Sequence, residues 1–137
     1  MAQDSRFLTA APPPKIVAQR NATVESRLSV DLRRGYHVNS NAPNDDYLIP
    51  LRLRWEAGPL ESVEVLYPKP EERNYPFSSK PVSVFTGEFQ ILTRFKVGAS
   101  APAGPGVLVG KLRYQACSDD TCYRPVTLEI RLPYEIR

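Results

Sequence analysis

The sequence predicts an all-β domain with the fold of an immunoglobulin-like antiparallel β-sandwich. Apolar and polar residues alternate with period two along most of the chain, turn-forming residues separate the alternating segments, and no sustained amphipathic helical period is present. The 14 prolines disfavour long helices and favour short strands joined by turns. In such a sandwich each sheet buries its apolar face against the other.

The alternation defines the strands in chain order. Their apolar positions are Leu28, Val30 and Leu32; Ile49, Leu51, Leu53 and Trp55; Val63 and Val65; Phe89, Ile91, Thr93, Phe95 and Val97; Leu108, Leu112, Tyr114 and Ala116; and Val126, Leu128, Ile130 and Leu132. Further short strands are expected at Val82–Phe85 and near Tyr36. Turn residues at 57–59, 68–70 and 102–106 connect them.

Length and composition limit the function classes. At 137 residues the chain has room for one domain and one core. Its hydrophobic content of 42% and charged content of 24% argue against wholesale disorder. A net charge of +3 with no local cluster of Lys and Arg gives no basis for nucleic-acid binding. The uncharged stretch at 97–110 is interrupted by proline and glycine and is too short to insert into a membrane.

The chain is expected to divide into an arm and a domain. Residues 1–22 are predicted to form a flexible arm, because Pro12, Pro13 and Pro14 cannot continue a helix and favour an extended polyproline conformation. Residues 23–137 carry the alternating pattern and are predicted to form the sandwich.

Segments 39–46 and 68–81 depart from the alternation. The first is polar and turn-forming, whereas the second is longer and mixes charges with the aromatic residues Tyr75 and Phe77. A loop of this length in a compact domain is usually functional or mobile. Its aromatic centre places apolar rings where a simple solvent loop would have none.

The two cysteines, Cys117 and Cys122, flank a turn formed by residues 118–121. Cysteines so placed face each other across an antiparallel strand pair, where opposed Cα atoms lie about 4.5–5.5 Å apart, within the roughly 4.4–6.8 Å that disulfides span. A disulfide is therefore feasible, and an oxidising compartment would let it persist. Its role stays open between a structural clip, a redox pair and, with His37 as a third ligand, an incomplete metal site.

The residues around the cysteines resemble a known family. The run YQAC at 114–117, followed after the turn by CYRPV at 122–126, resembles the signature of the N-terminal periplasmic domain of the thiol:disulfide interchange protein DsbD. GYHV at 35–38, YLIP at 47–50 and LYP at 66–68 are also similar to that family, so the resemblance covers residues 26–133.

This resemblance implies a protein-disulfide reductase domain that is not a complete enzyme alone. Cys117 and Cys122 would be its catalytic residues, with no cofactor and no metal. Cys122 would form a mixed disulfide with the partner and Cys117 would resolve it. A membrane-embedded or thioredoxin-like domain would donate electrons, and a periplasmic disulfide isomerase or the thioredoxin-like protein of cytochrome c maturation would accept them. The location would be the bacterial periplasm, as a domain of an inner-membrane protein.

The family also has a cap loop whose aromatic side chain shields the cysteines. Residues 71–80 are the candidate cap, with Tyr75 or Phe77 as the shielding ring. The local sequence NYPF at 74–77 differs from the acidic-aromatic-aromatic-Gly run of the family, so the choice of ring stays open.

Three further residues are candidate neighbours of the cysteine pair: Tyr36, His37 and Tyr123. The resemblance places Tyr36 in the floor of the site. The simplest interpretation of His37, the single histidine, is a surface or packing residue, but it would tune a thiol if the fold brings it close.

The alternative hypothesis is a β-sandwich binding module without enzymatic activity, in which Cys117–Cys122 is a structural disulfide. In that case the ring closed by the bond is small, and its loss would cost about 2 kcal/mol of stability.

Overall fold

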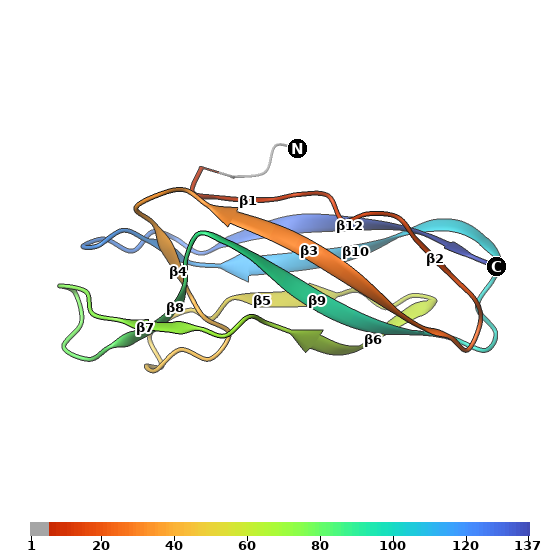
Figure 1. The fold of residues 1–137 in the computed structure, drawn as a ribbon, viewed down its shortest axis with the longest axis horizontal. Helices are drawn as coiled ribbons and strands as arrows, with labels where there is room; N and C mark the ends of the chain where they lie inside the picture. The colour runs from red at the N-terminus through yellow and green to blue at the C-terminus, as the bar shows by residue number, and fades with distance from the viewer. Residues whose placement is uncertain (1–5) are drawn as a thin grey trace.

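The computed structural model describes residues 6–137, and within that range it contains β-strands and no helix. The strands form the predicted immunoglobulin-like β-sandwich, drawn out along one axis, with a smaller sheet at one end (Figure 1). No helix that could cross a membrane occurs in this described part of the chain.

One layer of the sandwich is a sheet in the order β1-β3-β9-β6. Its strands are β1 (Leu8–Ala10), β3 (Thr23–Leu32), β9 (Glu88–Val97) and β6 (Leu60–Leu66). The long strands β3 and β9 pair antiparallel, and their residues alternate between buried and exposed as the sequence predicts. In β6 a register shift between Ser62 and Glu64 interrupts the alternation, which leaves Val63 54% exposed.

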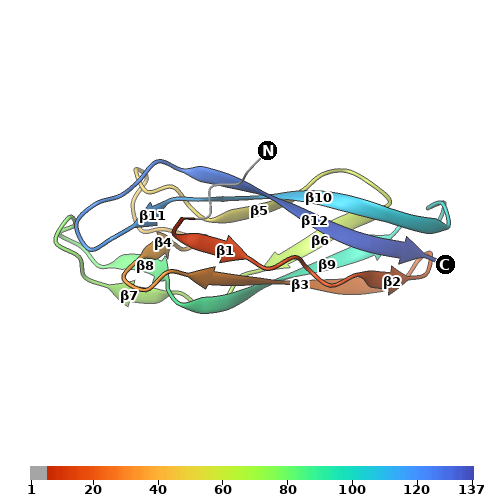
Figure 2. The same ribbon diagram turned by 90° about the horizontal axis from the view of Figure 1, so that it is seen from above.

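The second layer is a sheet in the order β2-β12-β10-β5. Its strands are β2 (Ile16–Ala18), β12 (Val126–Ile136), β10 (Gly104–Tyr114) and β5 (Arg52–Trp55). The two layers face each other along the length of the domain (Figure 2). Two of these strands differ from the prediction: β5 begins at Arg52 and not at Ile49, and β10 already begins within the predicted turn at 102–106.

The core lies between these layers and is continuous with the end sheet. Its largest fully buried side chains include Tyr114, Phe95, Leu112 and Ile91. The Trp55 ring, predicted to be core, packs edge-on against Phe95, and its indole nitrogen donates to the buried Thr93 hydroxyl at 2.9 Å. This bond joins β5 in one layer to β9 in the other.

A third sheet, in the order β11-β4-β8-β7, lies at the left-hand end in Figure 1. Its strands are β11 (Ala116–Cys117), β4 (His37–Asn39), β8 (Val82–Phe85) and β7 (Glu71–Arg73). β4 and β8 are buried at every position, so both faces of this sheet are covered. β7 lies inside the segment that the sequence analysis treats as an irregular loop, and it pairs with β8.

The faces of this third sheet are distinguished by the strand register. Val38 pairs with both Ala116 and Phe85, and these three side chains join the main core. Since successive residues of a strand point to opposite faces, His37 and Cys117 lie together on the other face. The buried Cys117 therefore lies on the face of this sheet that points away from the main core.

The expected flexible arm over residues 1–22 is corrected by the structure. Residues 1–5 lie outside the described part, but residues 6–22 contain β1, which pairs antiparallel with β3, and β2, which pairs parallel with β12. The backbone amide of Arg33 also donates to the Phe7 carbonyl at 2.8 Å. This segment therefore crosses from one layer to the other and adds an edge strand to each. It also buries Phe7 and Leu8 in the core.

Candidate redox site

Cys117 and Cys122 are joined in a disulfide, the bond that the sequence spacing makes feasible. Their Cα atoms are 4.0 Å apart, closer than the roughly 4.5–5.5 Å expected for opposed strand residues. The two cysteines differ in exposure: Cys117 is fully buried, whereas Cys122 is exposed. An approaching partner therefore meets Cys122 and not Cys117.

The turn between the cysteines is held by its own hydrogen bonds. The Ser118 amide donates to the Thr121 carbonyl at 2.8 Å, and the Thr121 amide donates to the Ser118 hydroxyl at 3.2 Å. The Ser118 and Thr121 hydroxyls also donate to the Asp120 carboxylate, at 3.1 and 3.2 Å. These bonds hold Cys117 and Cys122 opposite each other.

A buried polar network, which the sequence analysis does not identify, fixes the strand that carries Cys117. The Gln115 side-chain carbonyl accepts from the Asn39 amide group at 3.2 Å and from the Ile49 backbone amide at 3.3 Å, and the Gln115 amide group donates to the Tyr123 carbonyl at 3.3 Å. The sequence signal for it was a polar residue, Asn39, at the end of a short strand. Each hydrogen-bonded amide group in this network resists displacement, because leaving it unpaired would cost about 1–3 kcal/mol. The Asn39 Oδ1 atom is the exception, since it is buried without a partner among the described residues.

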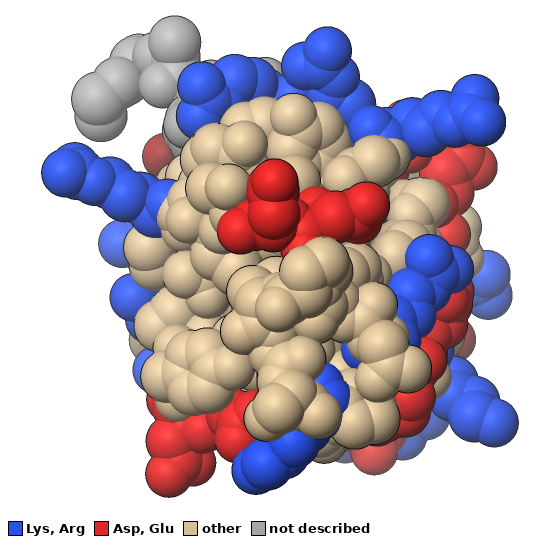
Figure 3. All heavy atoms as spheres, turned by 90° about the vertical axis from the view of Figure 1, so that its left-hand side faces the viewer, with Lys and Arg blue, Asp and Glu red and all other residues tan. Residues whose placement is uncertain are grey.

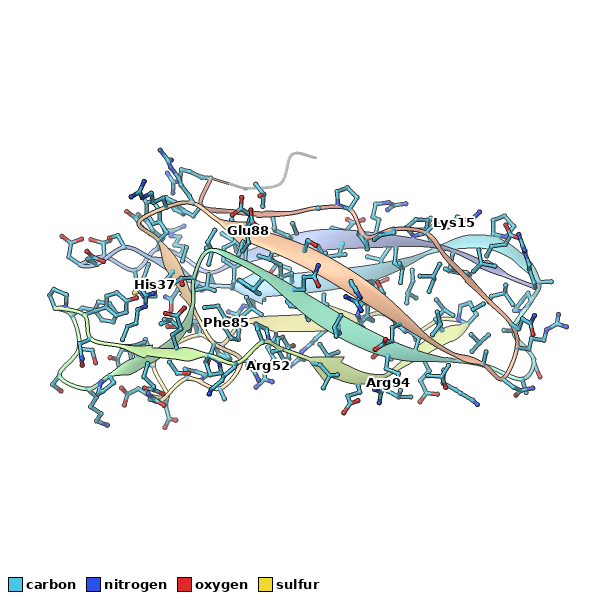
Figure 4. All side chains as sticks on the ribbon, viewed as in Figure 1. Lys15, His37, Arg52, Phe85, Glu88 and Arg94 are labelled. Atoms are coloured by element: carbon cyan, nitrogen blue, oxygen red, sulfur yellow. A yellow bond between two sulfur atoms is a disulfide. The ribbon has the colours of Figure 1, made fainter. Side chains whose placement is uncertain are left out.

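His37 is brought next to the disulfide by the fold. It is 2% exposed, and it is the direct cross-strand partner of Cys117 in the β4–β11 pair. Figure 4 labels it at this end of the domain. Its Nε2 atom is buried and has no hydrogen-bond partner among the residues that the structure describes.

The predicted cap residues Tyr75 and Phe77 stack with His37. The ring centroids of Tyr75 and His37 are 4.1 Å apart with an interplanar angle of 14°, and Phe77 packs on Tyr75 at 5.5 Å. Both rings also pack against a small cluster of Leu48, Val82 and Val84. The two rings therefore pack over His37, on the sheet face that also carries Cys117.

The cap loop is tied to segment 39–46, the other segment that departs from the alternation. The Asn44 side chain donates to the Pro81 carbonyl at 2.9 Å, and Lys80 forms an ion pair with Asp45 at 3.1 Å. Within the loop, the Ser78 amide donates to the Tyr75 carbonyl at 3.1 Å. The two irregular segments thus support each other at this end of the domain.

Tyr36 and Tyr123 lie on the opposite side of the cysteine strands from the cap. Tyr36 directly precedes His37, and Tyr123 directly follows Cys122. Since successive residues of a strand point to opposite faces, both tyrosine side chains point away from the face of His37 and Cys117. Both rings contact Phe7, at centroid distances of 4.4 and 4.5 Å. Phe7 was not among the predicted site residues, because it lay in the segment interpreted as an arm.

Burial determines the charge state of His37. It lowers the pKa of His37 from its ordinary 6.5 to about 4, with Arg73 acting in the same direction and the negative charge of Asp119 opposing both. The imidazole is therefore neutral at neutral pH. Burial also raises the pKa of Tyr75, so its phenol stays protonated beside the imidazole.

This shift predicts a pH-dependent stability. The folded state binds fewer protons than the unfolded state between the folded pKa of about 4 and the unfolded 6.5, so the free energy of unfolding falls as the pH drops through this window. By pH 4 the loss should reach about 3 kcal/mol. Denaturant unfolding of the oxidised domain at pH 7 and pH 4, compared with His37→Phe, isolates this contribution, since the carboxylates are common to both. Equal pH dependence in the two proteins would contradict it.

The surface at this end combines an uncharged centre with charged surroundings. Uncharged side chains occupy most of the middle of the face around a small acidic group, and basic and further acidic side chains lie at the periphery (Figure 3). A groove of about 340 Å³ opens beside His37 and Tyr75. Its charged lining residues are Arg33, Arg34, Arg73 and Asp119. No group of three or more His, Cys, Asp and Glu side chains able to hold a metal ion occurs within residues 6–137.

Comparison with solved structures supports the fold assignment. The N-terminal periplasmic domain of ScsB from Proteus mirabilis aligns with a TM-score of 0.65 at 15% identity, covering 96% of this chain and 48% of that chain. This chain thus spans about half of that structure. The reduced N-terminal domain of DsbD from Neisseria meningitidis aligns with a TM-score of 0.60 at 19% identity, covering 96% and 88%. A type I cohesin of Clostridium thermocellum, from the Coh-OlpC-Doc435 complex, reaches 0.51 at 13% identity, covering 100% and 98%. At these identities the likeness is one of fold alone.

Sequence comparison gives the family. A comparison with curated proteins finds no match. The profile described as "Thiol:disulfide interchange protein DsbD, N-terminal" matches residues 5–133, a range that includes both cysteines. This confirms the resemblance seen around the cysteines. The chain therefore belongs to the family of DsbD N-terminal domains, and its Cys117–Cys122 disulfide is that of a thiol-disulfide exchange domain.

Proposed function

We propose that this domain acts in the bacterial periplasm as a protein-disulfide reductase module. It takes electrons from a membrane-embedded or thioredoxin-like donor and passes them to oxidised partner proteins. The observation that carries the proposal is the unequal burial of the disulfide, with Cys122 exposed and Cys117 enclosed, in a chain of this family.

The proposed exchange proceeds in two displacement steps. In the reduced domain the Cys122 thiolate attacks one sulfur of the partner's disulfide, a mixed disulfide forms, and the partner's other sulfur leaves as a thiolate. Cys117 then loses its proton and attacks the Cys122 sulfur, which releases the second partner sulfur. The partner gains two electrons, and the domain is left with the Cys117–Cys122 disulfide. The donor restores the dithiol by the reverse sequence.

The unequal exposures of the two cysteine residues support this assignment of roles. Exchange requires one accessible sulfur for attack and a second thiol nearby to resolve the mixed disulfide. Exposed Cys122 suits the first role, and Cys117, held opposite it by the short turn, suits the second. Burial also protects the Cys117 thiol from small oxidants.

Tyr75 and Phe77 are proposed as the cap of this site. They pack over the face that carries Cys117 by stacking on His37, and the loop that holds them is anchored to segment 39–46 through Asn44 and Asp45. Moving the loop on docking would open that face only when a partner is present. On the other side, Tyr36 and Tyr123 would form the floor.

The accepting partners are proposed to be a periplasmic disulfide isomerase and the thioredoxin-like protein of cytochrome c maturation. Such proteins present an active cysteine on a surface that must approach Cys122 closely. The largely uncharged middle of the end face, which includes the Tyr75 and Phe77 loop, offers an area for that contact with few charges to desolvate (Figure 3).

The proposal is tested by mixing the reduced domain with an oxidised periplasmic disulfide isomerase and quenching with a thiol-alkylating reagent that adds a resolvable mass. We expect alkylated isomerase to appear as alkylated domain disappears, one dithiol for one disulfide. The domain kept oxidised serves as the control. Unchanged alkylation of both proteins over hours, with the domain folded, would contradict a reductase role toward this class of partner.

A further inference from the structure

His37 holds a buried polar atom whose hydrogen-bonding capacity is unused in the oxidised domain. Nε2 of this 2% exposed residue has no partner within residues 6–137. A buried polar group left unpaired costs about 1–3 kcal/mol, so it calls for an explanation, and a redox role is one of those known. The Asn39 Oδ1 atom is also buried and unpaired, but of the two residues only His37 is the cross-strand partner of a cysteine.

Reduction of the disulfide would create the missing partner. A disulfide sulfur carries no proton, whereas a thiol is a hydrogen-bond donor. Cys117 is fully buried, so its thiol would have no access to water and would need an acceptor inside the protein. His37 is its direct cross-strand neighbour on the same sheet face, where paired Cβ atoms lie about 4.5–5.5 Å apart.

The cap residue Tyr75 does not supply the hydrogen bond that His37 Nε2 lacks. Tyr75 stacks on the flat face of the His37 ring, so it covers that face without offering the ring edge a hydrogen-bond partner. The charged groups that act on His37 are Asp119, in the cysteine turn, and Arg73, on the strand before the cap. The lowered pKa keeps the ring neutral, which leaves one ring nitrogen as an acceptor.

We propose that Nε2 of His37 accepts the proton of the Cys117 thiol, first as a hydrogen bond in the reduced domain and then as general base when Cys117 resolves the mixed disulfide. The proposal rests on the proposed exchange function and assigns to His37 a role beyond packing. It requires the neutral tautomer with its proton on Nδ1.

The step balances in protons and electrons. The Cys117 S–H proton moves to Nε2 only as the sulfur electron pair forms the new bond to the Cys122 sulfur, because an imidazole with a pKa of about 4 is too weak a base to deprotonate the thiol beforehand. The bond between Cys122 and the partner breaks, and its electron pair leaves with the partner sulfur as a thiolate. The imidazolium then returns its proton to that thiolate or to water, because burial disfavours the charged ring.

Ellman's reagent, an aromatic disulfide, separates the two steps in the full chain. The reduced domain should release one coloured thiolate rapidly as Cys122 forms the mixed disulfide, and a second one more slowly as Cys117 resolves it. His37→Phe, which keeps an aromatic ring under Tyr75, should slow the second release about tenfold and leave the first unchanged. His37→Asn, which keeps a polar acceptor, should recover part of the rate.

Nitrogen-15 NMR of the wild-type imidazole provides a readout that does not depend on a variant folding. On reduction, the Nε2 resonance should shift toward that of a hydrogen-bonded acceptor while Nδ1 remains protonated.

Two results would overturn the inference: unchanged Nε2 and Nδ1 resonances between the oxidised and reduced domains, or a folded His37→Phe that releases the second thiolate at the wild-type rate. Equal slowing of both releases would assign His37 a structural role only. Failure of the wild-type domain to release a second thiolate would instead contradict the exchange function itself.

Discussion

Replacing Cys122 with serine should abolish exchange and leave the fold intact, whereas replacing Cys117 with serine should trap the partner. Without Cys122 the exposed attacking sulfur is lost, and Cys117 is enclosed by the protein. Without Cys117 the first step still occurs, but the resolving thiol is missing, so a mixed disulfide accumulates. Non-reducing electrophoresis of each variant with an oxidised partner measures both outcomes.

The two variants control for each other, because each removes the same bond. If Cys117–Cys122 were only a structural clip, both variants would lose about 2 kcal/mol of stability and neither would capture a partner. Trapping by Cys122→Ser rather than by Cys117→Ser would reverse the proposed roles.

Removing both cap rings should make the disulfide more reactive toward a small thiol reductant. Each stacked aromatic pair contributes about 0.5–1.5 kcal/mol, so Tyr75→Ala with Phe77→Ala should raise the population of the open loop and speed reduction by dithiothreitol about tenfold. Tyr75→Ala alone should account for the larger part of this increase in the reduction rate, since Tyr75 stacks directly on His37 at 4.1 Å.

Phe89→Ala is the matched control for the cap. It removes a half-buried ring that packs at a tilt against Phe85 on the main-core side of the third sheet, away from the face that Tyr75 and Phe77 cover. Its reduction rate should equal that of the wild type. An unchanged rate in the Tyr75 and Phe77 double variant would remove the cap assignment.

The long strands could be predicted because their information is local. In β3 every buried position is separated from the next by one exposed residue, and β9 and the first part of β12 show the same period-two burial, a pattern that is visible without knowing the partner strand. The short strands β1, β2 and β7 show too few residues to display a period. β1 and β2 pair with the long strands β3 and β12, and β7 pairs with the short β8, so tertiary contacts decide these pairings.

The same difference between local and long-range contacts explains which parts of the site could be predicted from the sequence. The pairing of Cys117 with Cys122 is predictable because a short turn determines it. The neighbour of Cys117 is set by the β4–β11 register, which joins distant parts of the sequence, so the burial of His37 follows only from the fold. Phe7 was missed for a related reason: the prolines that follow it favour an arm, and its place against Tyr36 depends on β1 pairing with β3.

The choice between the two cap rings likewise needed three-dimensional information. Sequence alone left Tyr75 and Phe77 as alternatives, and the structure stacks Tyr75 directly on His37 with Phe77 against Tyr75. The two residues form one stack, so the proposed shield consists of both rings.

The reduction potential of the Cys117–Cys122 pair tests the central claim most directly. It is measured by equilibrating the domain in thiol redox buffers and counting alkylated cysteines by mass. An exchange module must both accept and give up electrons, so we predict a value between about −180 and −270 mV. A value below about −300 mV would mark a disulfide that stays closed, and would contradict the reductase role in favour of a structural clip in a binding module.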